Sequence, residues 1–250
     1  MLIPLVVSAI YAVSPPPASS REVPALYRSH VITRRIPTGG QKLLALTIDD
    51  GPTPRITPKM LDILRARKAR ATFFVLGSLA AGQPNLLRRM VKEGHAIGSH
   101  TYSHRYHPTQ TEAADELHKT AAAIKKAVGF SPTLFRPPGG FRDSWTYRLA
   151  KEEGYTVVLW TIASADTVTN DSRAIARNVI HTPNPGDIIL IHDAAAKLPT
   201  LRALPRILDE LISKGWRFVT LPELMQTAAA NQPKVTAHHP ASSRQIAAPR

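Results

Sequence analysis

The chain has 250 residues, 43% of them hydrophobic, which is enough for one well-buried core. Lysine and arginine outnumber aspartate and glutamate by 32 to 18, and the resulting formal net charge of +14 favours anionic surroundings such as nucleic acid, acidic wall polymers or lipid headgroups. The absence of cysteine excludes disulfides, thiolate metal ligands and a cysteine nucleophile.

The two ends of the chain differ in composition from its middle. Residues 1–13 form a largely apolar stretch interrupted by Pro4, and three prolines follow at positions 15–17. This pattern is typical of the hydrophobic part of an export signal that lacks a basic start, and it is too short for a membrane span. We therefore predict a signal-like leader and linker over residues 1–42, with a disordered leader as the alternative, and a secreted or extracytoplasmic protein that can associate with the membrane. Residues 227–250, rich in Ala, Pro, Ser and Gln with scattered bases, predict a flexible tail.

Residues 43–226 alternate short apolar runs with longer helical patterns and are predicted to form the catalytic domain. The seven predicted strands are residues 43–50, 71–77, 95–99, 134–136, 155–162, 187–192 and 217–220. One of the intervening helices opens with a capping box, formed by Thr109 and Glu112, and stops at Gly129. The alternation predicts parallel βαβ units and an α/β fold.

Two motifs predict a metal site with a spare carboxylate beside it. Asp49 and Asp50 end the first predicted strand, where neighbouring side chains point to opposite faces, so both can reach one centre only if the following Gly-Pro bends the chain. His100 and His104 are four residues apart, a spacing of roughly 13 Å on a strand but about 6 Å on a helical turn. We therefore expect the chain to coil at His100.

Polar residues with catalytic potential lie at the carboxyl ends of five of the predicted strands. They are Asp49, Asp50, His100, Arg136, Asp166 and His192. In parallel α/β proteins the carboxyl ends of the strands carry the active site. These side chains are therefore expected to meet at one end of the sheet.

The same motifs resemble those of the polysaccharide deacetylases of carbohydrate esterase family four, which include the chitooligosaccharide deacetylases of nodulation. The matching segments, in the family's order, are Thr-Ile-Asp-Asp-Gly-Pro at 47–52, His-Thr-Tyr-Ser-His at 100–104, Arg-Pro-Pro-Gly-Gly at 136–140 and Leu-Ile-His at 190–192. The resemblance covers residues 43–224, and its first two motifs together are highly specific. It implies a distorted (β/α)7 barrel resembling a TIM barrel, which the strand count supports.

The resemblance also implies how the first motifs act. Asp50, His100 and His104 would bind a divalent metal, usually Zn²⁺ with Co²⁺, Ni²⁺ or Mn²⁺ as alternatives, and leave positions open for water and substrate. Asp49 would be the general base, and Arg136 would orient it. A cation held in this way lowers the pKa of bound water toward about 7. The cation and the guanidinium would both offset the repulsion between the two carboxylates.

The later motifs would act on the leaving group and on the oxyanion. His192 is the family's general acid, and Asp166 is expected to hold it protonated. A backbone N–H near Gly139 matches the family's second oxyanion contact, and loss of such a donor typically costs about 10²- to 10³-fold in rate. Leu190 shares a strand face with His192 and is expected to line the acetyl pocket, as the matching leucine does in the family.

One motif departs from the family's pattern, in which an acid-rich segment ends in Asp-Trp. Here Asp166 is retained, whereas Ala163 replaces the usual first Asp and Thr167 replaces the usual Trp. The proton-transfer chemistry should persist. The pocket wall that the Trp forms is expected to be wider or to come from another loop.

These observations predict a metal-dependent hydrolase that removes acetyl groups from an N-acetylated glycan, with peptidoglycan or another N-acetylglucosamine polymer as the favoured substrate. An O-acetyl esterase acting on a xylan-like glycan is the alternative enzyme, because the same tetrahedral chemistry serves an ester. A glycan-binding relative that has lost turnover is an alternative of a different class. Nucleic-acid binding rests on charge alone, so no specific nucleic-acid partner is expected, whereas the basic charge suits an anionic cell-wall polymer or membrane surface.

Overall fold

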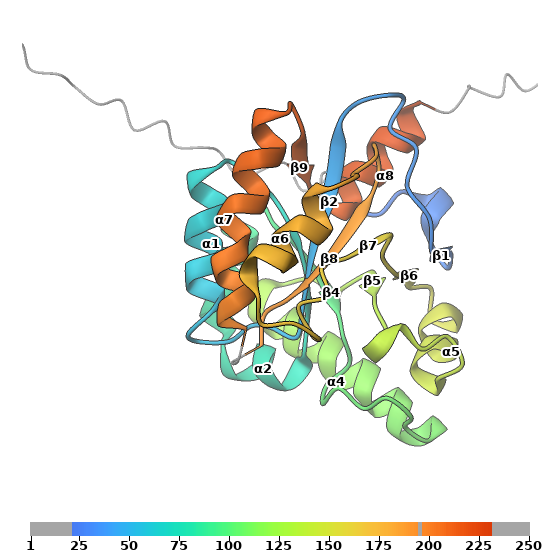
Figure 1. Cartoon of the computed structure of the whole chain (residues 1–250). Helices are drawn as coiled ribbons and strands as arrows, with labels where there is room; N and C mark the ends of the chain where they lie inside the picture. Colours follow the sequence, from blue (N-terminus) through green and yellow to red (C-terminus); the bar gives the residue numbers. More distant parts are fainter. Residues whose placement is uncertain (1–21, 195–196, 232–250) are drawn as a thin grey trace, which may run out of the picture.

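A curled parallel β-sheet with helices around it forms the centre of the computed structural model, which describes residues 22–194 and 197–231 (Figure 1). The strands are β1 Val31–Ile32, β2 Leu43–Asp49, β3 Thr72–Val75, β4 Ala96–Ser99, β5 Leu134–Phe135, β6 Thr156–Val158, β7 Ile162–Ala163, β8 Ile188–His192 and β9 Arg217–Val219. Their order is β1-β6-β5-β4-β3-β2-β8-β7, and β9 also pairs with β2. All of these pairings are parallel, as the βαβ alternation predicts.

The predicted strand at residues 155–162 is divided into two. Its first part, β6, pairs with β5, whereas its second part, β7, pairs with β8 at the opposite end of the strand order. Because β6 and β7 belong to one short segment, this segment joins the two ends of the sheet and closes it into a distorted barrel. The α/β fold and the distorted (β/α)7 barrel are thereby confirmed, with β1 as an addition.

Helices cover the outside of the sheet (Figure 1). They are α1 Thr57–Ala66, α2 Gly77–Gly82, α3 Pro84–Lys92, α4 Gln110–Val128, α5 Trp145–Glu152, α6 Ser172–Ile180, α7 Leu198–Ser213 and α8 Leu221–Ala230. The predicted capping box is present at the start of α4, where the Thr109 side chain accepts from the Glu112 N–H, and Gly129 ends the helix in a left-handed conformation. Within the described residues, no helix is long and apolar enough to cross a membrane.

The alternation of side chains along β2 determines what faces the barrel interior. Leu46 and Ile48 pack outward in a core cluster with α1 and α7. Leu43 and Ala45 belong to a second cluster with residues of β3, β5, β6, β8 and β9, which is the barrel interior. Asp49 is on the same strand face as Leu43 and Ala45, so its carboxylate points into the interior at the carboxyl end of β2.

Residues before 43 also belong to the folded unit. Val31 and Ile32 pair with β6 as strand β1. Val23 and Ile36 are each only 2% exposed and pack in the interior cluster with α8, so the packed chain begins well before the expected boundary at residue 43. The predicted leader at residues 1–13 and the tail beyond 231 lie outside the described residues, and α8 continues to Ala230, past the expected boundary at 226.

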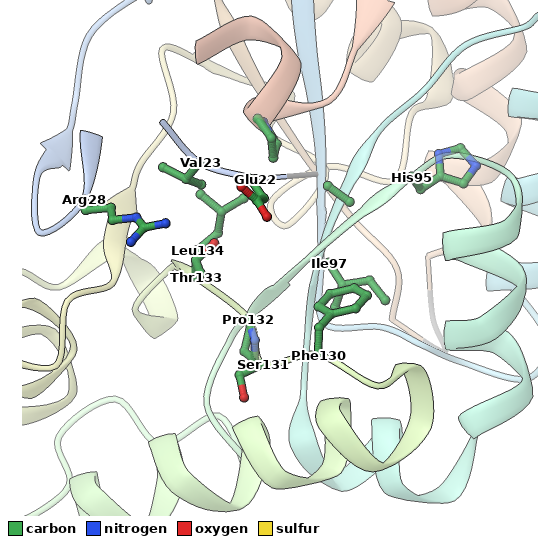
Figure 2. A pocket seen from close by; sticks show the side chains of 12 residues that line it. Glu22, Val23, Arg28, His95, Ile97, Phe130, Ser131, Pro132, Thr133 and Leu134 are labelled. Atoms are coloured by element: carbon green, nitrogen blue, oxygen red, sulfur yellow. The ribbon is translucent and has the colours of Figure 1, made fainter. Parts of the chain in front are cut away.

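A pocket of about 300 Å³ opens at the amino ends of β4 and β5. Figure 2 shows Glu22, Val23 and Arg28 of the N-terminal segment facing residues 130–134 across it. Ala96 and Leu134, the first residues of β4 and β5, line this pocket, whereas none of the predicted catalytic or metal-binding residues does. It therefore lies at the opposite end of the strands from those residues.

Candidate active site

The side chains singled out from the sequence meet at the carboxyl end of the barrel. Asp49 ends β2 and is in register with His192, which ends β8. His100 directly follows β4, Arg136 follows β5, and Asp166 lies three residues after β7. Five strands thus deliver polar groups to one place, as the rule for parallel α/β proteins requires.

Asp50, His100 and His104 form a cluster that fits a metal ion. The Asp50 Oδ1 atom lies 3.5 Å from His100 Nε2 and 3.4 Å from His104 Nε2. One ligand atom from each residue lies within 4.8 Å of the others, and no other such group of three occurs in the described part of the chain. Asp50 Oδ1 is buried without a hydrogen-bond partner, which is costly for a carboxylate unless a cation binds there. Two imidazoles and a carboxylate are a donor set typical of zinc.

The backbone turns sharply at both metal-binding motifs. Asp50 itself adopts a φ of 74°, so the bend begins one residue before the Gly-Pro that predicted it. The helical turn expected at His100 is not formed. Instead Thr101 and His104, with φ of 68° and 64°, turn the chain so that the two histidine ring centroids are 5.0 Å apart. Left-handed backbone is unusual for a β-branched residue such as Thr101, so the surroundings must hold this loop.

Glu116 of α4 holds the loop and was missed by the sequence analysis. Its side chain accepts hydrogen bonds from the Tyr102 N–H at 2.7 Å and from the Ser103 N–H and hydroxyl at 2.7 and 2.5 Å. The glutamate is only 8% exposed. The sequence feature that could have identified Glu116 is its position on the buried face of α4. The other buried residues of this helix are Ala113, Leu117, Thr120, Ile124 and Ala127.

The imidazole of His100 is fixed for metal binding. Its Nδ1 lies 2.7 Å from the backbone carbonyl of Arg136, which can only accept, so Nδ1 carries the proton and Nε2 presents its lone pair toward Asp50. Burial lowers the pKa of His100 to about 3, against the opposing effect of the Asp50 charge. The ring is therefore neutral at physiological pH, as a metal ligand must be.

Arg136 is fully buried and bonded to Asp49. Its Nη1 donates to Asp49 Oδ1 at 2.7 Å and to the Thr47 hydroxyl at 2.9 Å, while Nε and Nη2 donate to the carbonyls of Val158 and Leu159. This network shows that Arg136 is not simply a solvated charge at the end of a strand. Burial raises the pKa of Asp49, and the guanidinium of Arg136 opposes the rise. With Oδ1 bonded to Arg136, the other oxygen, Oδ2, faces His100 Nε2 at 3.8 Å.

His192 and Asp166 form a buried pair at the end of β8, where His192 is in register with Asp49. His192 Nδ1 lies 2.7 Å from Asp166 Oδ1, and the His192 N–H donates to Asp166 Oδ2 at 2.8 Å. Thr200 donates to the same oxygen, and Lys197 Nζ donates to the Asp166 carbonyl, each at 2.7 Å. Burial alone would lower the pKa of His192, but the bond to Asp166 and the charges of Asp49 and Asp166 outweigh it and raise this pKa.

Asp193 directly follows His192 in the chain, but its side chain bonds to other residues. Its carboxylate accepts from the hydroxyls of Thr53, at 2.7 Å, and Thr57. Burial raises its pKa to about 6, against the hydrogen bonds from the two threonines. A Cβ at Gly51 would lie only 2.5 Å from Asp193 Oδ2, so the glycine lets this carboxylate pack under the turn that follows Asp50.

Leu190 and Gly139 border the same centre. Leu190 is in register with Thr47 and is 6% exposed, and it shares the interior face of β8 with His192. Gly139 lies three residues after Arg136 and adopts a φ of 63° in a short 3₁₀ turn, Pro138–Gly140. The roles of Leu190 in the acetyl pocket and of the Gly139 N–H at the oxyanion stay predictions.

The segment that lacks the family's Trp is open to solvent. Thr167 is exposed, and its neighbour Val168 is 83% exposed. A different tryptophan lies near the site. A Cβ at Gly140 would be 2.8 Å from the Trp160 ring, and the Arg136 guanidinium carbon lies 5.7 Å from the centroid of that ring. The bend between β6 and β7 therefore places an aromatic side chain beside the 136–140 loop.

Comparison with known proteins places this geometry in context. Residues 37–158 match the family model described as polysaccharide deacetylase. The chain is 38% identical over 200 residues to a peptidoglycan-N-acetylglucosamine deacetylase of Bacillus cereus, covering 78% of this chain and 93% of that protein. It is 33% identical over 202 residues to a chitooligosaccharide deacetylase of a Bradyrhizobium species, covering 74% and 91% of the two chains. A crystal structure of a peptidoglycan N-acetylglucosamine deacetylase superposes with a TM-score of 0.73 at 32% identity, covering 82% and 98%.

Proposed function

Because the chain belongs to the polysaccharide deacetylase family, whose deacetylases are metal-dependent hydrolases, we propose that it hydrolyses the N-acetyl groups of N-acetylglucosamine units in peptidoglycan. The observation that carries the proposal is the cluster of Asp50, His100 and His104 with Asp49 and, in register with it, His192 at the same end of the barrel. An acid, a base and a ligand set in one place are what amide hydrolysis requires.

Asp50, His100 and His104 would hold the cation, and we propose Zn²⁺, because one carboxylate and two neutral imidazoles suit it. Bound there, a divalent cation acidifies a water molecule and polarises the acetyl carbonyl. The ligand atoms are positioned by the protein itself, through the Arg136 carbonyl on His100 and through Glu116 on the loop before His104. Such supporting contacts are what fix the direction of metal ligands.

Asp49 is the base in this proposal. Arg136 occupies its Oδ1, so the proton of the attacking water is taken at Oδ2, the oxygen that faces His100. Burial raises the pKa of this carboxyl group, which makes it a better proton acceptor than a solvated aspartate, and the guanidinium keeps it ionised before reaction. The four hydrogen bonds of Arg136 prevent either group from rotating away.

His192 is the acid. Its Nδ1 is bonded to Asp166, so the proton that leaves is on Nε2, and it goes to the nitrogen of the departing amine as the C–N bond breaks. The raised pKa of His192 keeps the imidazolium populated near neutral pH. Asp166 is held in turn by Thr200, so the ring orientation is fixed before substrate binds.

We place the reaction outside the cytoplasm, at the cell wall or membrane surface. The apolar residues 1–13 support this, as does the net charge of +14, which suits anionic wall polymers and lipid headgroups. The full-length protein fused to a reporter that is active only after export tests the location. A fusion that stays inactive would contradict it.

Acetate release tests the proposed activity. The protein, stripped of metal and then supplied with Zn²⁺, Co²⁺, Ni²⁺ or Mn²⁺, is incubated with peptidoglycan, N-acetylglucosamine oligomers and acetylxylan. We expect release from the N-acetylated substrates to exceed release from acetylxylan. The opposite ranking would indicate an O-acetyl esterase, and glycan binding without acetate release under any metal would indicate a relative that has lost turnover.

A further inference from the structure

An aromatic patch borders the proposed metal ligands on the side of His104. We define it as Tyr106, His107 and Phe141. The ring centroids of His104 and Tyr106 are 5.1 Å apart, those of Tyr106 and Phe141 are 5.7 Å apart, and those of His107 and Phe141 are 5.0 Å apart. The rings therefore form a continuous series of contacts that begins at a proposed ligand.

The patch is exposed. Tyr106 is 49% exposed and Phe141 40%, and His107 is exposed as well. A single exposed aromatic residue is ordinary on a protein surface, but contiguous exposed rings are a feature of binding sites. The hydrogen bonds of the proposed mechanism do not involve these residues, so the function proposed above leaves the patch unexplained.

Two separate loops build the patch over a glycine. Tyr106 comes from the loop after β4 and Phe141 from the loop after β5. A Cβ at Gly139 would lie 2.6 Å from Phe141 Cε2 and 3.1 Å from Tyr106 Cε1, so both rings rest directly on this backbone, which a side chain would prevent. The patch therefore adjoins the reacting centre at two points, the proposed ligand His104 and the predicted oxyanion contact Gly139.

We propose that Tyr106 and Phe141 form a stacking subsite for a sugar ring of the glycan next to the sugar that loses its acetyl group. The inference rests on the proposed function and adds a position at which chain length is sensed. One face of a pyranose ring carries C–H groups, and these pack on the electron-rich face of an aromatic ring while the hydroxyl groups remain in water. Because Tyr106 contacts His104, a glycan bound at the proposed metal ligands lies beside the patch. We therefore assign the patch to the glycan in the active site.

Chain-length dependence tests the proposal. Tyr106→Ala and Phe141→Ala are compared with wild type on the dimer and the pentamer of N-acetylglucosamine. Each variant is expected to lose about tenfold in kcat/KM for the pentamer, mainly through KM, equivalent to about 1.4 kcal/mol of binding. The dimer should be affected less. Tyr106→Phe and Phe141→Tyr, which keep the rings, should behave like wild type, and so should Phe130→Ala, which removes an aromatic ring from the pocket at the other end of the strands (Figure 2).

A binding measurement separates this inference from the proposed function. Calorimetric titration of the pentamer into metal-loaded protein that carries Asp49→Asn should show about tenfold weaker binding when Tyr106→Ala or Phe141→Ala is added. Leucine at either position is the second variant if alanine prevents folding, as judged by thermal unfolding. Unchanged pentamer affinity in these variants, or no pentamer binding by the Asp49→Asn protein, would overturn the subsite. If these variants bind the pentamer more weakly but the protein with Asp49 intact releases no acetate, the subsite is retained and the proposed function is overturned.

Discussion

The buried pair of His192 and Asp166 allows the proton-transfer part of the account to be tested through Asp166→Asn. The substitution removes the charge that faces His192 Nδ1 at 2.7 Å while keeping the shape of the side chain. Asparagine keeps a neutral acceptor, so the loss is the difference between a hydrogen bond to a charged group, about 1.5–3 kcal/mol, and one to a neutral group, about 0.5–1.5 kcal/mol, which is roughly 1–1.5 kcal/mol. The His192 side chain is 15% exposed, so solvent screening reduces this value little. We therefore expect the pKa of His192 to fall in this variant.

The assay is the dependence of kcat/KM on pH. In the proposed mechanism His192 acts in its protonated form, so its titration sets the alkaline limb. This limb should move to lower pH by about one unit in Asp166→Asn, because one pH unit corresponds to about 1.36 kcal/mol. Asp193→Asn is the matched control, because Asp193 follows His192 in the chain but bonds to Thr53 and Thr57. An unchanged alkaline limb in Asp166→Asn, or an equal displacement in Asp193→Asn, would refute the assignment.

The pair of His192 and Asp166 also makes the free energy of unfolding depend on pH. The pKa of His192 is raised in the folded protein, so its contribution is present below the unfolded value of about 6.5 and is lost as pH rises through the folded value. The pKa of Asp166 is lowered, so its contribution is present above about 3.9 and is lost as pH falls through the folded value. Urea unfolding should show the largest difference between wild type and Asp166→Asn at about pH 4–6.5, and a smaller one above.

Three further substitutions test the supporting contacts. Glu116→Gln removes the charge that accepts three hydrogen bonds from Tyr102 and Ser103, and should weaken metal affinity about tenfold in titrations against a chelator; unchanged affinity would contradict this. Arg136→Lys leaves buried acceptors unpaired and should lower kcat by about 10²-fold with metal retained, whereas near-normal kcat would separate Arg136 from the chemistry. Gly51→Ala should cost about 1–3 kcal/mol in urea unfolding, because its Cβ would meet the Asp193 carboxylate, and no loss would contradict the close packing.

Local patterns predicted much of this structure because their physical causes are local. The capping box at Thr109 and the stop at Gly129 define α4 as predicted, since both satisfy hydrogen bonds within a few residues. The apolar run that ends in Asp49 and Asp50 forms a strand buried on both faces, as a parallel sheet requires. The motifs then identified the side chains that meet at one end of the barrel.

The remaining features depend on contacts between distant parts of the chain. Strand β1 has only two residues and pairs with β6, which is distant in the chain, so no local pattern of its own predicts it. Glu116 is one acidic residue on the buried face of a helix, and its function is visible only once the 100–104 loop packs against it. Tyr106 and Phe141 are separated by a helix and a strand, and Gly139 brings their rings together.

We propose that Asp50, His100 and His104 bind the metal while Asp49 acts only in catalysis. The most direct measurement is metal content per chain, determined together with acetate release, in Asp49→Asn and His104→Ala. We expect Asp49→Asn to hold one metal ion per chain and to lose about 10²-fold or more in kcat, and His104→Ala to lose both metal and activity. An Asp49→Asn protein without metal or with near-normal kcat, or a His104→Ala protein that still holds one metal ion, would contradict it.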